Sequence, residues 1–107
     1  MKPLLRKCLV AAGLTLSLPV AAHTPVLNCQ LDESASNVVC QAGFSDSSTA
    51  PNIVMEVYSE DDDMLHAGRT DESSIYTFAR PDGIFFIIMD AGPGHVIEIS
   101  SDEVQGI

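Results

Sequence analysis

About seven short runs of strand-forming residues follow one another along the chain, with turn-forming residues at intervals of roughly 8 to 12 positions. Apolar and polar residues alternate in most of these runs, as they do in a strand that buries one face. No helical periodicity occurs after residue 22. The pattern therefore predicts an all-β fold, a seven-stranded antiparallel sandwich of the immunoglobulin-like or transthyretin-like kind.

We expect these strands at residues 26–31, 37–44, 53–59, 64–68, 75–79, 84–89 and 95–100. The run at 84–89 is entirely apolar, which indicates a strand at the centre of the sandwich or one that is buried on both faces. Residues 101–107 have the composition of a frayed acidic tail. The apolar residues are enough for one thin core, and a domain this small cannot also enclose a large ligand cavity.

The first 22 residues have the pattern of a secretory signal peptide. A basic start containing Lys2, Arg6 and Lys7 precedes an apolar stretch that is shorter than the roughly 20 residues needed to cross a bilayer. Small residues favour cleavage after Ala22. We expect a cleaved signal peptide at 1–22, a sandwich domain at 23–100 and an acidic C-terminal tail at 101–107. The product would be a periplasmic protein that is not embedded in the membrane.

The net charge of the chain after residue 22 limits the classes of molecule that it can bind. After residue 22 the chain has two arginines, no lysine and all 15 carboxylates, a formal charge of −13. Such a surface repels nucleic acid and anionic lipid and attracts cations or basic proteins. The chain contains no G-x-S-x-G, no H-E-x-x-H and no phosphate-binding glycine loop, so we expect it not to be an enzyme.

Cys29 and Cys40 are the two cysteines beyond the leader, in a compartment where disulfides persist. A hairpin whose turn is centred between Ser34 and Ala35 places them opposite each other, at a distance that a disulfide can bridge. Use of the two thiolates as metal ligands is disfavoured because they lack a C-x-x-C spacing. The sequence predicts a Cys29–Cys40 disulfide.

Three histidines are candidate metal ligands. Cleavage after Ala22 makes His23 the first residue, which then offers its α-amino nitrogen and its ring Nδ1 to one metal ion. His95 ends the Asp-Ala-Gly-Pro-Gly-His segment, whose glycines and proline predict a tight, rigid loop. His66 is a third candidate on a hairpin. The alternative is that all three are incidental, with His23 an accident of cleavage, His95 a strand opener and His66 an exposed residue.

Two acidic turns have structural interpretations as well as functional ones. Residues 60–63 (EDDD) offer oxygen ligands that suit Ca²⁺, but they lack the spacing of a calcium-binding loop and are typical of a solvated turn. Asp71 is expected to hold its own turn through backbone hydrogen bonds.

Five segments appear in the order seen in a known family: residues 43–46 (GFSD), 53–58 (IVMEVY), 68–72 (GRTDE), 75–78 (IYTF) and 89–95 (MDAGPGH). In this respect the chain resembles small exported proteins with a carboxypeptidase-regulatory-like, transthyretin-like domain. Those proteins include accessory components linked to nickel and cobalt uptake transporters. The resemblance implies a seven-stranded sandwich, no catalysis and a part in periplasmic metal handling. It also implies that His23 matches a histidine near the mature N-terminus that holds nickel in related uptake systems.

Together these features predict a periplasmic, non-catalytic protein that binds a divalent transition metal for uptake or delivery. Nickel is favoured, with copper and cobalt as alternatives. The predicted ligands are His23, His95 and His66, and the predicted partner is a membrane transporter component. The competing hypothesis is a metal-independent protein–protein interaction module with an acidic face.

Overall fold

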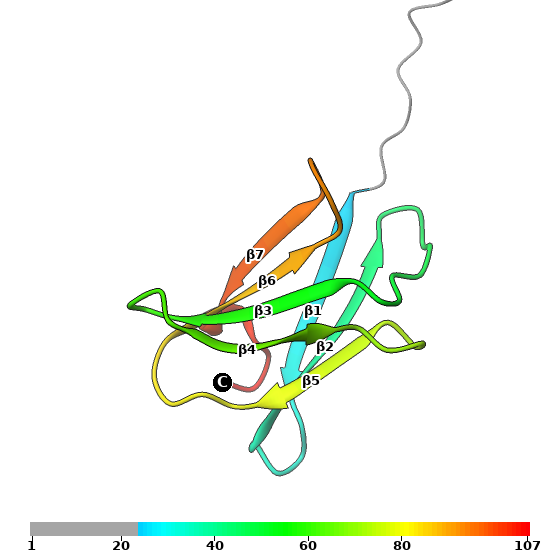
Figure 1. The fold of residues 1–107 in the computed structure, drawn as a ribbon. Helices are drawn as coiled ribbons and strands as arrows, with labels where there is room; N and C mark the ends of the chain where they lie inside the picture. Colours follow the sequence, from blue (N-terminus) through cyan, green and yellow to red (C-terminus); the bar gives the residue numbers. More distant parts are fainter. Residues whose placement is uncertain (1–23) are drawn as a thin grey trace, which may run out of the picture.

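A computed structural model describes residues 24–107 as two antiparallel sheets packed face to face (Figure 1). The strands are β1 (Pro25–Leu31), β2 (Asn37–Phe44), β3 (Val54–Ser59), β4 (Met64–Arg69), β5 (Ile75–Ala79), β6 (Phe85–Asp90) and β7 (Val96–Ser100). The predicted all-β sandwich is confirmed, and each expected strand is present to within one residue at either end. The expected signal peptide lies outside the described residues.

The sheets contain strands that are not neighbours in sequence. One sheet has the order β1-β2-β5 and the other β4-β3-β6-β7. In the constant-type immunoglobulin order the fourth strand belongs with the first, second and fifth, whereas here β4 pairs with β3. The core between the sheets is formed by alternate residues of both, chiefly Leu27, Val38, Phe78, Met55, Val57, Phe85, Ile87 and Met89. No helix within residues 24–107 is long and apolar enough to span a membrane.

The apolar run at 84–89 forms a strand inside its sheet but is not buried on both faces. Phe85, Ile87 and Met89 are fully buried against the opposite sheet. Phe86 and Ile88 point the other way and are only half-buried on the outer surface. Of the two readings that the sequence left open, the structure therefore supports the central strand.

The β1–β2 hairpin has the register predicted from the cysteines. Cys29 is paired with Cys40, and an S–S bond of 2.05 Å joins them. Both cysteines are buried in the core. The predicted disulfide is confirmed, and it ties β1 to the central strand of its sheet.

Residues 101–107 are not frayed, and that expectation was wrong. Ser101–Glu103 forms a short 3-10 turn, η2, and the Val104 side chain after it is only 3% exposed. The backbone N–H of Gln105 donates to the Cys29 carbonyl at 3.0 Å, and the Leu31 N–H donates to the Gln105 carbonyl at 3.0 Å. The segment is held because it buries one valine and satisfies backbone groups on the outer edge of β1.

Candidate metal centre

The loop between β6 and β7 presents His95 in a fixed backbone conformation. The Asp90 carboxylate accepts the Gly92 N–H at 2.9 Å, and the His95 N–H donates to the Gly92 carbonyl at 2.8 Å. Gly92 and Gly94 have φ angles of 111° and 79°, which side chains other than hydrogen rarely allow. The rigid loop predicted from the glycines and proline is present, and Asp90 serves it as a turn-holding group.

Within residues 24–107, Nδ1 of the His95 imidazole has a hydrogen-bond partner and Nε2 has none. Its Nδ1 lies 3.0 Å from the Pro93 carbonyl oxygen. A carbonyl oxygen only accepts, so Nδ1 is the donor in this contact, and in the neutral ring the lone pair then lies on Nε2. Ring nitrogens that bind metals are commonly oriented in this way by a backbone carbonyl on the other nitrogen. The half-buried ring borders a shallow pocket of about 260 Å³ together with Phe44, Ser48 and Ala91.

The described chain begins at the same end of the sandwich. The Ser45 N–H donates to the Thr24 carbonyl at 2.8 Å, and the Thr24 N–H donates to Ser45 Oγ at 3.3 Å. Ser45 directly follows Phe44, which lines the pocket of His95. Figure 1 shows the start of β1 beside the β6–β7 loop. His23, the predicted terminal ligand, lies outside the described residues.

His66 lies at the opposite edge of its sheet. It is on β4, whereas His95 precedes β7, and β3 and β6 lie between these two strands. At about 4.8 Å per strand, three spacings separate the two histidines across the sheet. The His66 ring packs 5.3 Å from the ring centroid of Phe78, so it faces the core and not the solvent-exposed rim that we expected. The structure does not bring His66 and His95 together.

The described residues contain no group of three or more His, Cys, Asp or Glu side chains that could hold a metal ion. This includes the acidic turn at 60–63, where Ser59 Oγ accepts the N–H groups of Asp61 and Asp63 at 3.2 and 3.1 Å. The calcium alternative therefore has no gathered ligand set in this part of the chain. Asp71 has its predicted role, because its carboxylate accepts the N–H groups of Ser73 and Ile75 at 2.8 and 2.9 Å.

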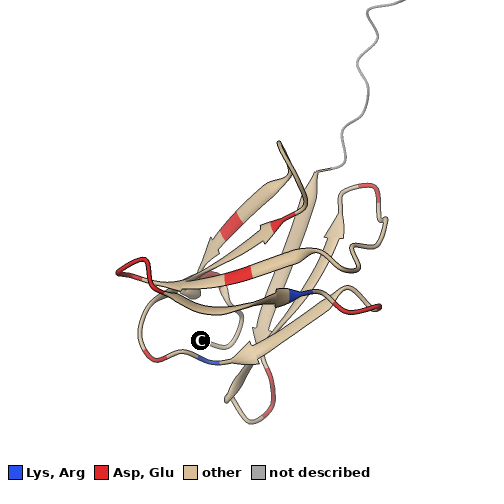
Figure 2. Ribbon diagram, in the orientation of Figure 1, with Lys and Arg blue, Asp and Glu red and all other residues tan. Residues whose placement is uncertain are grey.

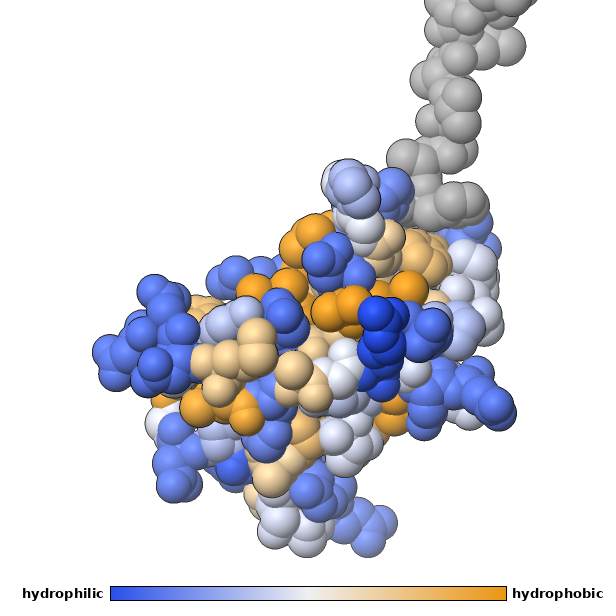
Figure 3. All heavy atoms as spheres, in the orientation of Figure 1, coloured by the Kyte–Doolittle hydropathy of each residue, from blue (hydrophilic) through white to orange (hydrophobic). Residues whose placement is uncertain are grey.

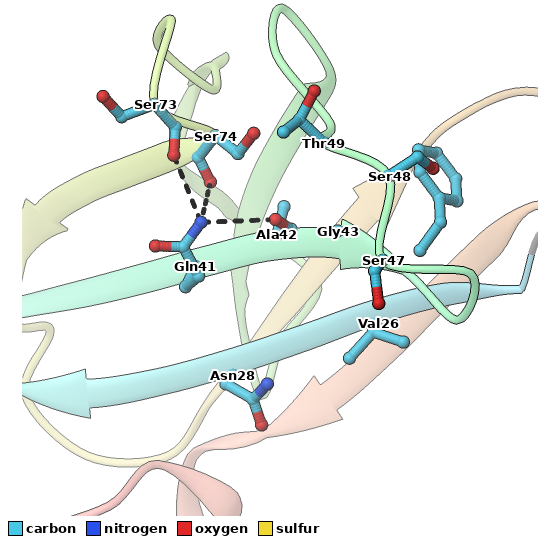
Figure 4. Close-up of a pocket in the computed structure, with 11 residues that line it drawn as sticks. Val26, Asn28, Gln41, Ala42, Gly43, Ser47, Ser48, Thr49, Ser73 and Ser74 are labelled. Carbon is cyan, nitrogen blue, oxygen red and sulfur yellow. Dashed lines mark hydrogen bonds between the residues drawn. The ribbon is translucent and has the colours of Figure 1, made fainter.

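A second hollow, of about 260 Å³, lies over β1 and β2 and was not foreseen from the sequence. Its wall includes Gln41, and Figure 4 shows the amide nitrogen of Gln41 directed at the carbonyl oxygens of Ser73, Ser74 and Ala42. The three distances are 3.1, 3.5 and 3.4 Å respectively. The residues that line this hollow are uncharged, and the Gln41 amide nitrogen already has three carbonyl oxygens within hydrogen-bonding distance.

No family model, no curated protein and no solved structure matches the chain. The resemblance to carboxypeptidase-regulatory-like domains accordingly stays a prediction. The functional conclusion rests on the residues at the β6–β7 end of the sandwich.

Proposed function

We propose that the exported protein binds a divalent transition metal in the periplasm at the end of the sandwich where β1 starts. Nickel is favoured, with copper and cobalt as alternatives, and the role is uptake or delivery to a membrane transporter component. The proposal is carried by one observation: the His95 Nδ1 lies 3.0 Å from the Pro93 carbonyl oxygen, with Nε2 on the other side of the ring, at the end of the molecule where the described chain begins.

The remaining donors in this proposal come from the new N-terminus. Cleavage after Ala22 gives His23 a free α-amino group, which chelates a metal together with its ring Nδ1. Pro25 has no N–H, so a deprotonated amide from that position cannot join the set. The His95 Nε2 completes a group of three nitrogen donors, a set that suits nickel and copper. His66 is left out because it packs against Phe78 at the far edge of the sheet.

The test is a titration with Ni²⁺ and Cu²⁺ by calorimetry. The protein that begins at His23, verified by mass spectrometry, is compared with a version whose α-amine is acetylated. Acetylation removes the amine as a donor, and we expect the affinity to fall at least about tenfold, a loss that even outer-shell changes at metal sites can cause. Equal affinity of the two versions would exclude the terminus from the site.

Two substitutions distinguish the contributions of His95 and His66 to metal binding. His95→Gln should weaken binding at least about tenfold, because it removes the Nε2 donor. His66→Gln is the matched control and should leave the metal affinity unchanged, since its ring contacts Phe78. A loss caused by His66→Gln and not by His95→Gln would place the site elsewhere. Circular dichroism of both variants checks that the sandwich is retained.

A further inference from the structure

The outer face of the four-stranded sheet exposes apolar side chains in the middle of an acidic surface. The strand pairing places Tyr58 of β3 beside Phe86 of β6. Ile88 follows on the same face of β6, and all three side chains are half-buried. Met64 and Val96, which are 51% and 54% exposed, extend the apolar surface toward the two edges of the sheet. Figure 3 looks onto this side of the molecule and shows apolar atoms exposed between hydrophilic ones.

Carboxylates surround this apolar floor. The register places Ile88 between Glu56 of β3 and Glu98 of β7, and the β3–β4 turn adds Glu60 and Asp62 at one end. A shallow hollow of about 590 Å³ is lined by Tyr58, Phe86, Ile88, Glu60, Asp62 and Glu98. Figure 2 shows the acidic positions on β3 and β7 and in the turn.

A basic residue, Arg69, lies on this face at the end of β4 away from the acidic turn, where it keeps its charge. Arg69 lies opposite Val54 at the edge strand, and its guanidinium donates to the Asn52 carbonyl at 3.0 Å. Glu56 accepts the Tyr58 hydroxyl at 3.2 Å, which leaves its charge facing the same surface. The carboxylates therefore present a negative potential around the aromatic pair.

Charge complementarity selects the occupant of this face. A second copy would bring Glu56 and Glu98 against like charges, and nucleic acid or anionic lipid would be repelled in the same way. A guanidinium satisfies both parts of the surface, because its plane stacks on aromatic rings and its N–H groups pair with carboxylates. We propose that the outer face of β3, β6 and β7 docks an arginine-bearing segment of a partner protein. This interaction is independent of the metal site.

The test uses the purified, isotope-labelled exported protein and a synthetic peptide in which arginine alternates with serine. Nuclear magnetic resonance titration should shift the backbone signals of β3, β6 and β7. The same peptide with citrulline, which is uncharged, should not bind. A lysine peptide of equal charge should bind several-fold more weakly, because an ammonium group stacks less well on Tyr58 and Phe86. Equal binding of the arginine and lysine peptides would overturn the role of the aromatic floor.

A matched pair of triple variants separates this face from general charge attraction. Glu56→Gln, Glu60→Gln and Glu98→Gln together should weaken binding of the arginine peptide about tenfold, because each substitution removes one exposed ion pair and exposed pairs are individually weak. The control removes three charges from the turns of the molecule through Glu33→Gln, Glu72→Gln and Asp82→Asn, and should change the affinity by less than about twofold. Equal losses in the two triples would overturn the proposal. Spermidine that binds the same residues more tightly than the peptide would assign the face to a small polyamine and overturn a protein partner.

Discussion

Asp32 is the residue whose titration is most clearly tied to the fold. Hydrogen bonds from the Asn37 side chain and from Ser34 lower its pKa from 3.8 to about 2. Between those values the unfolded chain binds the proton and the folded chain does not, so stability from Asp32 is complete above pH 3.8 and is lost as the pH falls toward 2. We predict that Asp32→Asn lowers the melting temperature at neutral pH. The difference from the parent protein should shrink as the solution is acidified through this range.

The matched control is the exposed carboxylate next to it in the same turn. Glu33→Gln removes the same charge without removing the bonds to Asn37 and Ser34. It should leave the melting temperature close to that of the parent at neutral pH. A difference between parent and Asp32→Asn that stays constant down to the lowest pH would contradict the proposed linkage.

Single residues also show which parts of the candidate metal site could be predicted from the sequence and which could not. The rigid His95 loop follows from glycines and a proline, whose backbone preferences are local. The proton on Nδ1 does not, because it depends on how the ring meets the Pro93 carbonyl. His66 was expected to be exposed, but it faces inward because a bulge between Val57 and Tyr58 shifts the register of β3 and β4. Without the bulge, His66 would share the outer face with Met64; with it, His66 lies opposite the buried Val57.

At the scale of elements, the strands were predictable because they depend on local signals, namely the alternation of apolar and polar residues and the turn-forming residues between strands. Residues 101–107 were not, because what orders them is distant along the chain. Their composition is polar, yet Val104 is buried and Gln105 bonds to the edge of β1. A contact between residues so far apart in sequence leaves no periodic signal in the short segment itself.

The packing of this C-terminal segment gives an element-scale prediction. Val104→Thr keeps the shape of the side chain but places a hydroxyl in the core, which should cost about 2 kcal/mol of unfolding free energy. The matched control is Val96→Thr, because Val96 is 54% exposed and threonine suits a strand equally well. We expect that control to stay within about 0.5 kcal/mol of the parent. Urea unfolding of both variants provides the measurement, and equal costs would contradict a packed C-terminus.

At the scale of the whole molecule, the sequence does not say which strands share a sheet. The outer face proposed for docking exists because β3, β6 and β7 are adjacent, which brings Tyr58, Phe86 and Glu98 together from three separate parts of the chain. The apolar run at 84–89 hinted at this surface, since a strand with one buried face has no need of apolar residues on the other. Only the strand pairing shows that Tyr58 of β3 and Glu98 of β7 lie next to this run.

The net charge gives a prediction for the molecule as a whole. All 15 carboxylates lie after residue 22, and the two arginines there donate to the backbone carbonyls of Asn52 and Ala35. Repulsion among the carboxylates destabilises the compact state, and salt screens it as the Debye length falls from about 30 Å at 0.01 M to about 8 Å at 0.15 M. We therefore predict that the melting temperature rises with sodium chloride over this interval. The triple variant Glu33→Gln, Glu72→Gln and Asp82→Asn should show a smaller rise, because it carries less charge to screen. A melting temperature that falls with added salt would mean that attractive pairs, and not repulsion, dominate the electrostatics of the sandwich.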